Sequence, residues 1–106
     1  DGHYKVVYPN QVEDYIKQNA FFLDVRTPEE FEEGSIFGSV NIEVDQLRQR
    51  ISEINVSKDT PIVVNCYVGL RAYLAIMILK SYGYTNLYNL SGGYRTYSAL
   101  NYKLIS

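Results

Sequence analysis

Cysteine, histidine and tryptophan are almost missing from this sequence. Its 106 residues include one cysteine, one histidine and no tryptophan. The single cysteine, Cys66, cannot form an internal disulfide, and one cysteine with His3 cannot supply the ligands of a structural zinc site. A lone thiol favours a reducing compartment, which predicts a cytoplasmic location, or a reactive role for the thiol itself. We therefore expect no bound metal.

Long apolar runs and a surplus of one charge are also missing. No apolar stretch approaches the length of about 20 residues that a membrane-spanning helix needs. Ten Lys plus Arg against twelve Asp plus Glu give a net charge of -2, so no broad positive field attracts polyanions. The composition, 46% hydrophobic, predicts a soluble globular domain and disfavours nucleic acid and membrane as partners.

The length fits one compact domain, since typical domains have about 100–150 residues. We find no repeat, linker or low-complexity segment, and we expect residues 1–106 to form a single domain. Because the chain begins with Asp1 rather than Met, we also expect that it was cut from a longer polypeptide.

Extended and helical patterns alternate along the chain. Short apolar or β-branched runs predict strands at 6–8, 21–25, 40–42, 62–65 and 87–90. Capping signals and helical spacing predict helices that begin at a capping box over 10–13 and that cover 27–34, 44–54, 70–82 and 94–100. The helix at 70–82 is apolar almost all round, which is typical of a buried helix. The alternation predicts an α/β domain with a mostly parallel five-stranded sheet and helices on both faces.

Four polar side chains stand where predicted strands end. They are Asp24, Asn41, Cys66 and Ser91. Ligands of open α/β sheets bind beyond the carboxyl ends of the strands. We therefore expect the functional site at this edge of the sheet.

The sharpest chemical feature is a six-residue turn between the strand at 62–65 and the helix at 70–82. It consists of Cys66, Tyr67, Val68, Gly69, Leu70 and Arg71. Backbone amides at the start of the helix are expected to converge on the sulfur, and with Arg71 they favour a thiolate, which is a nucleophile. The alternative is that Cys66 is a small buried core residue, as most free cysteines are.

Three further segments accompany this turn in a fixed order. They are LDVRTPEEF at 23–31, GSIFGSVNI at 34–42 and LSGGY at 90–94. Together with the cysteine turn they resemble the rhodanese family of sulfurtransferases over a core of about 6–97, and they are most similar to the rhodanese module appended to coenzyme A-disulfide reductases. The sequence departs from the family's usual residues at Ser35, Ser39 and Ala72.

The resemblance implies that the protein transfers sulfane sulfur. Cys66 would take a sulfur atom from thiosulfate, a polysulfide or a low-molecular-weight persulfide, hold it as a persulfide and pass it to a nucleophilic acceptor such as a thiol. The substrate would be bound by Tyr67, Val68, Gly69, Leu70 and Arg71, with Tyr67 and Leu70 at the mouth of the pocket. No cofactor is expected in this chain: it has no GxGxxG after a strand, so any flavin chemistry would belong to a fused or separate FAD-dependent disulfide reductase.

The charged residues near the turn have two interpretations. Arg71 either clamps an anionic substrate or pairs with a carboxylate and props the loop. Asp24 and Arg26 are expected to be structural supports, because a buried acid at a strand end is normally paired.

Two other functions stay open. Cysteine-dependent phosphatases of related folds also place Cys and Arg in an anion-binding loop, but Cys66 and Arg71 enclose four residues, one fewer than in those loops. The chain could also be a docking or redox-regulatory module without catalysis, although rhodanese-like modules of that kind frequently lack the cysteine.

Overall fold

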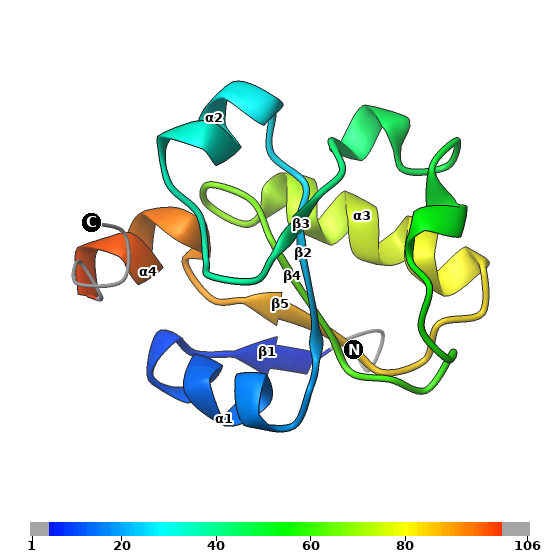
Figure 1. Ribbon diagram of the computed structural model, residues 1–106, viewed down its shortest axis with the longest axis horizontal. Coiled ribbons are helices and arrows are strands. Elements are labelled where there is room, and N and C mark those ends of the chain that lie inside the picture. The colour runs from blue at the N-terminus through cyan, green and yellow to red at the C-terminus, as the bar shows by residue number, and fades with distance from the viewer. Residues whose placement is uncertain (1–4, 101–106) are drawn as a thin grey trace.

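The computed structural model describes residues 5–100; residues 1–4 and 101–106, and His3 with them, lie outside the described part. Its centre is a five-stranded sheet in the order β1-β5-β4-β2-β3 (Figure 1). The strands are β1 (Lys5–Val7), β2 (Phe21–Asp24), β3 (Val40–Asn41), β4 (Ile62–Asn65) and β5 (Leu87–Leu90). Every strand pair within residues 5–100 is parallel, so the predicted α/β fold with a five-stranded sheet is confirmed.

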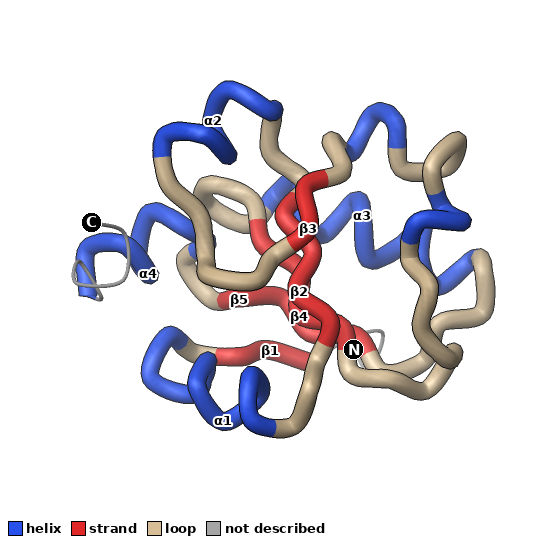
Figure 2. Tube along the Cα trace, in the orientation of Figure 1, coloured by secondary structure: helices blue, strands red, loops and turns tan. Residues whose placement is uncertain are grey.

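Helices cover both faces of the sheet (Figure 2). They are α1 (Val12–Lys17), α2 (Pro28–Glu33), α3 (Leu70–Ser81) and α4 (Gly93–Leu100), with three 3-10 turns, η1 (Pro9–Gln11), η2 (Val44–Gln46) and η3 (Ile51–Glu53). Side chains alternate along each strand, which divides the core in two. Ile62 and Val64 face the cluster that contains α3, whereas Val63 faces the cluster that contains Val12 of α1 and Tyr97 of α4.

The predicted helix at 44–54 is wrong. The chain instead forms the separate 3-10 turns η2 and η3. Val44 and Leu47 are three residues apart, as are Ile51 and Ile54, and a three-residue spacing matches the 3-10 period. Leu47 and Ile54 are both buried, so two tight turns bury the apolar side chains that had indicated one helix.

Two details of the predicted helices also differ. The capping box expected at 10–13 is replaced by η1, where the side chain of Gln11 accepts a hydrogen bond from the amide of Tyr8 at 3.0 Å, and α1 begins at Val12.

Helix α3 is buried on one side only: Ala75 and Ile76 are buried, whereas Leu74 is 50% exposed. A helix packed on one face of a sheet is covered along a single stripe, whatever the polarity of its other side. Among residues 5–100, none of the helices combines the length and apolar character needed to cross a bilayer.

Candidate active site

Cys66 lies at the carboxyl end of β4, the middle strand of the sheet. Its side chain is 1% exposed. The sulfur Sγ accepts a hydrogen bond from the amide of Gly69 at 3.0 Å. Gly69 has a φ of 126°, a conformation that side-chain-bearing residues rarely adopt, and this lets the chain curl back toward Sγ just before α3 begins. Asp24 ends β2, Asn41 ends β3 and Ser91 directly follows β5, so the polar residues predicted at this edge of the sheet do lie there.

Helix α4 fixes the direction of the peptide groups in the cysteine turn. The amide of Tyr94 donates to the carbonyl of Cys66 at 2.7 Å, and the amide of Arg95 donates to the carbonyl of Tyr67 at 3.0 Å. In a trans peptide the N–H points opposite to the C=O, so the amides of Tyr67 and Val68 face away from α4. Within the described residues Gly69 is the amide that reaches Sγ, and the convergence of several amides on the sulfur stays a prediction.

Gly93 allows this close approach of α4. A Cβ atom at Gly93 would collide with the carbonyl groups of Tyr67 and Cys66, and the residue has a φ of 65°. The sequence placed residues 91–93 between a predicted strand and a predicted helix but did not predict their contact with the cysteine turn. The signal was present in the paired glycines, which often mark a close backbone approach.

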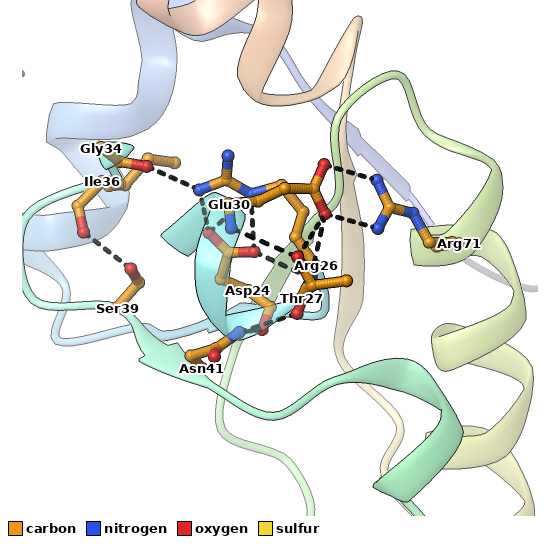
Figure 3. A network of polar contacts seen from close by, with 9 residues as sticks. All are labelled: Asp24, Arg26, Thr27, Glu30, Gly34, Ile36, Ser39, Asn41 and Arg71. Carbon is orange, nitrogen blue, oxygen red and sulfur yellow. Dashed lines mark hydrogen bonds and ion pairs between the residues drawn. The ribbon is translucent and has the colours of Figure 1, made fainter. Parts of the chain in front are cut away.

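Arg71 is paired with a carboxylate from α2 (Figure 3). Its Nη1 and Nη2 donate to Oε1 and Oε2 of Glu30 at 2.8 and 3.1 Å. The hydrogen bonds from Arg71 are the main reason that the pKa of Glu30 falls to about 2. The pKa of Arg71 is raised, first by Glu30 and to a smaller extent by electrostatic interaction with Cys66. These contacts are those that the propping interpretation of Arg71 requires, and the sequence did not identify Glu30 as its partner.

Helix α2 is placed by its own capping residues. Thr27 Oγ1 accepts from the amide of Glu30 at 3.2 Å, and the carboxylate of Glu30 accepts from the amide of Thr27 at 3.0 Å. Pro28 occupies the first helical position. The predicted start of this helix is therefore confirmed, and it also holds Glu30 toward Arg71.

A buried ion pair lies beneath α2. Arg26 Nη2 and Asp24 Oδ2 are 2.7 Å apart, and the two side chains are 3% and 0% exposed. Nη2 of Arg26 also donates to the carbonyl of Gly34 at 2.7 Å, which ties the end of β2 to the end of α2. Asn41 Nδ2 donates to the carbonyls of Asp24 and Arg26 at 3.0 and 2.9 Å. Both charges are thus satisfied inside the protein, as a supporting role requires.

The remaining residues of the cysteine turn are exposed. Tyr67, Val68 and Leu70 are 44%, 56% and 70% exposed. Tyr67 borders a pocket of about 360 Å³, whereas Leu70 lies outside it. The pocket is lined by Arg26, Glu30, Glu33, Gly34, Tyr67, Tyr94 and Ser98. Cys66 is not part of this lining. Within residues 5–100 no three His, Cys, Asp or Glu side chains are grouped so that they could hold a metal ion.

This geometry defines the class of protein. It is a parallel α/β domain with one cysteine in a turn at the end of its middle strand. The sequence profile of the rhodanese-like domain matches residues 8–100. The chain therefore belongs to the rhodanese-like domain family, which confirms the resemblance predicted from its motifs.

Individual relatives agree with this assignment. The chain is 41% identical over 78 residues to the uncharacterized protein YqhL of Bacillus subtilis, covering 74% of this chain and 60% of that protein. It is 29% identical over 98 residues to the thiosulfate sulfurtransferase GlpE of Ectopseudomonas mendocina, covering 92% of this chain and 88% of that one. The crystal structure of reduced Bacillus anthracis CoADR-RHD superposes with a TM-score of 0.89 at 32% identity, over 99% of this chain and 18% of that longer chain.

Proposed function

We propose that this domain is a rhodanese-type sulfurtransferase and that Cys66 is its nucleophile. The names of curated relatives support the class of reaction, since several are thiosulfate sulfurtransferases. The observation that carries the assignment to Cys66 is the 3.0 Å hydrogen bond from the amide of Gly69 to Sγ, at the start of α3. A donor of this kind stabilises an anionic sulfur more than a neutral one.

The first half of the reaction loads sulfur onto the enzyme. The Cys66 thiolate attacks the outer sulfur of thiosulfate, and a bond forms between Sγ and that sulfur. The sulfur–sulfur bond of thiosulfate breaks, and its electron pair leaves with sulfite. No oxidant, reductant or proton is consumed, which suits a turn that contains neither histidine nor a carboxylate.

The second half passes the sulfur on. A nucleophile such as a thiolate attacks the outer sulfur of the Cys66 persulfide, and the bond from that sulfur to Sγ breaks. Sγ keeps the electron pair and returns to the thiolate. The amide of Gly69 and the positive end of α3 face negative charge in both halves, so the same groups serve loading and unloading.

Arg71 is a positioning residue in this proposal. Glu30 holds its guanidinium at the start of α3, where it interacts electrostatically with Cys66. The buried pair of Asp24 and Arg26 in turn anchors the strand end from which α2 and Glu30 extend.

We also propose a cytoplasmic location, because the single thiol has to stay reduced to react. The link to a fused or separate disulfide reductase stays a prediction, supported by the reductase chain in which the CoADR-RHD match lies.

Mass spectrometry of the intact protein after incubation with thiosulfate tests the proposal. We expect a gain of one sulfur atom on Cys66, which cyanide or a thiol removes. The Cys66→Ser protein serves as the control and should gain nothing. Full sulfur transfer by Cys66→Ser, or no adduct on the native protein, would overturn the assignment. Cys66-dependent release of phosphate from an aryl phosphate would favour a phosphatase instead.

A further inference from the structure

The pocket beside the cysteine turn is lined by side chains that are paired with one another but still have hydrogen-bond donors without an acceptor. The guanidinium of Arg26 lies over the ring of Tyr94, 4.1 Å from its centre. Its Nε and Nη2 are occupied by Asp24 and by the carbonyl of Gly34. Within the described residues nothing accepts from Nη1, which carries no dashed line in Figure 3. Arg26 therefore brings two unused N–H groups to a pocket that it lines.

Tyr94 adds a second unused group. Its hydroxyl is buried, lies against Gly34 in the wall of the pocket and has no hydrogen-bond partner among residues 5–100. Burial raises the pKa of Tyr94, so the hydroxyl keeps its proton. A buried hydroxyl without a partner is costly, and a ligand with an acceptor atom would relieve that cost. Arg26 and Tyr94 together suit a carboxylate.

The rim of the pocket carries the opposite charge. Arg26 is balanced by Asp24, and Glu30 is balanced by Arg71. Glu33 is exposed at the end of α2 and is the remaining charge among the lining residues. The lining with its partners thus has an excess negative charge, which disfavours a dianion such as thiosulfate and favours a ligand with an ammonium group.

We infer that this pocket binds the amino and carboxylate groups of a small aminothiol acid of the cysteine class, which is the acceptor of the persulfide sulfur. The inference rests on the proposed function. The carboxylate binds Nη1 of Arg26 with the hydroxyl of Tyr94, and the ammonium binds Glu33. A volume of about 360 Å³ accommodates such a molecule. Tyr67 lines the pocket and directly follows Cys66 in the chain, so a ligand in the pocket lies beside the cysteine turn.

The chemical step needs no further reactant. The ligand's thiolate attacks the outer sulfur of the Cys66 persulfide, a new sulfur–sulfur bond forms, and the bond to Sγ breaks. The electron pair stays on Sγ, and the ligand leaves as its own persulfide. The oxidation state of sulfur is conserved overall, because one persulfide is exchanged for another.

Acceptor competition tests the inference. With the thiosulfate-loaded enzyme, L-cysteine should have a KM roughly fivefold to tenfold lower than N-acetylcysteine, which lacks the ammonium, or cysteamine, which lacks the carboxylate. Glu33→Gln should raise the KM for L-cysteine relative to that for 3-mercaptopropionate by roughly threefold to fivefold. Tyr94→Phe, which keeps the ring over Arg26, should raise the KM for L-cysteine relative to that for cysteamine. The matched control is Glu32→Gln, which alters an exposed glutamate of the same helix outside the pocket and should leave both ratios unchanged.

A binding measurement separates failure of this inference from failure of the proposed function. Titration of L-cysteine at millimolar concentration into the Cys66→Ala protein should shift the amide resonances of Gly34 and Ser98, and Glu33→Gln should weaken the shift. Binding without persulfide formation on the native protein would overturn the sulfurtransferase proposal and leave the ligand site. Persulfide formation without such shifts, or with equal KM values for all four thiols, would overturn the ligand site and leave the sulfurtransferase.

Discussion

The cysteine turn is held on two sides by different means. Toward α4 the contacts are between backbone groups, with the amides of Tyr94 and Arg95 on the carbonyls of Cys66 and Tyr67. Toward α2 they are between charged side chains, Arg71 and Glu30, each 33% exposed. Backbone contacts do not titrate and do not weaken in salt, whereas an ion pair at the surface does both. The shape of the turn therefore depends on the α4 side, and its charge depends on the α2 side.

The largest loss of stability is expected from Asp24→Asn, which breaks the anchor of the α2 side. The change leaves the buried guanidinium of Arg26 without its counter-charge, and removing one partner of a buried pair costs about 3–5 kcal/mol. Urea unfolding measures the loss. Glu29→Gln, on the exposed surface of α2, is the control and should unfold like the native protein. An equal and small loss in both proteins would show that the buried pair does not anchor this side.

Gly93→Ala should break the α4 side. Its φ of 65° costs about 1–2 kcal/mol for a residue with a side chain, and the new methyl group would push against the carbonyls of Cys66 and Tyr67. We expect the rate of persulfide formation to fall roughly 10- to 100-fold because the turn is displaced.

Gly38→Ala separates these two effects. Gly38 has a φ of 84° and has open space around the position of a new Cβ. This protein should lose similar stability from backbone strain and keep its rate of persulfide formation. If both alanine proteins lose the same activity, the contact of Gly93 with the cysteine turn is unimportant.

The two sides also differ in how far the sequence could predict them. The strand ends, the cysteine turn and the start of α2 are local patterns, and each lies within one residue of where the sequence placed it. The pair of Arg71 and Glu30 joins residues 41 positions apart, and no local pattern indicates which of four glutamates in α2 faces Arg71.

The same limit applies to the helices. Apolar spacing showed which side chains between 44 and 54 are buried but not that two 3-10 turns bury them, because both kinds of helix place residues three apart on one side. In α3 nearly every residue is apolar, so the sequence pattern did not indicate which side of the helix is buried. The packing of α3 on the sheet leaves Leu74 exposed.

Glu30→Gln should separate charge from stability on the α2 side. Because both partners are partly exposed, the free energy of unfolding should fall by less than about 1 kcal/mol. Release of Arg71 should nevertheless slow persulfide formation roughly threefold to tenfold, since its positive charge then moves away from Cys66. Glu53→Gln breaks the exposed pair with Arg50, away from the turn, and should leave the rate unchanged. A similar rate in all three proteins would refute a positioning role for this pair.

The smallest expected effect is a pH dependence that only the α2 side shows. Hydrogen bonds from Arg71 lower the pKa of Glu30 from its ordinary value of 4.5 to about 2 in the folded protein. A lowered folded-state pKa contributes stability that is complete above the unfolded-state value and is lost as the pH falls through the folded-state value. The difference in unfolding free energy between the native and Glu30→Gln proteins should therefore be constant above pH 5 and should close between about pH 4.5 and 2. Urea unfolding at stepped pH measures it, with Glu29→Gln as the control. A difference that stays constant down to pH 2 would mean that Arg71 does not hold Glu30 ionised, and the charge of the turn would then have to be set from the α4 side as well.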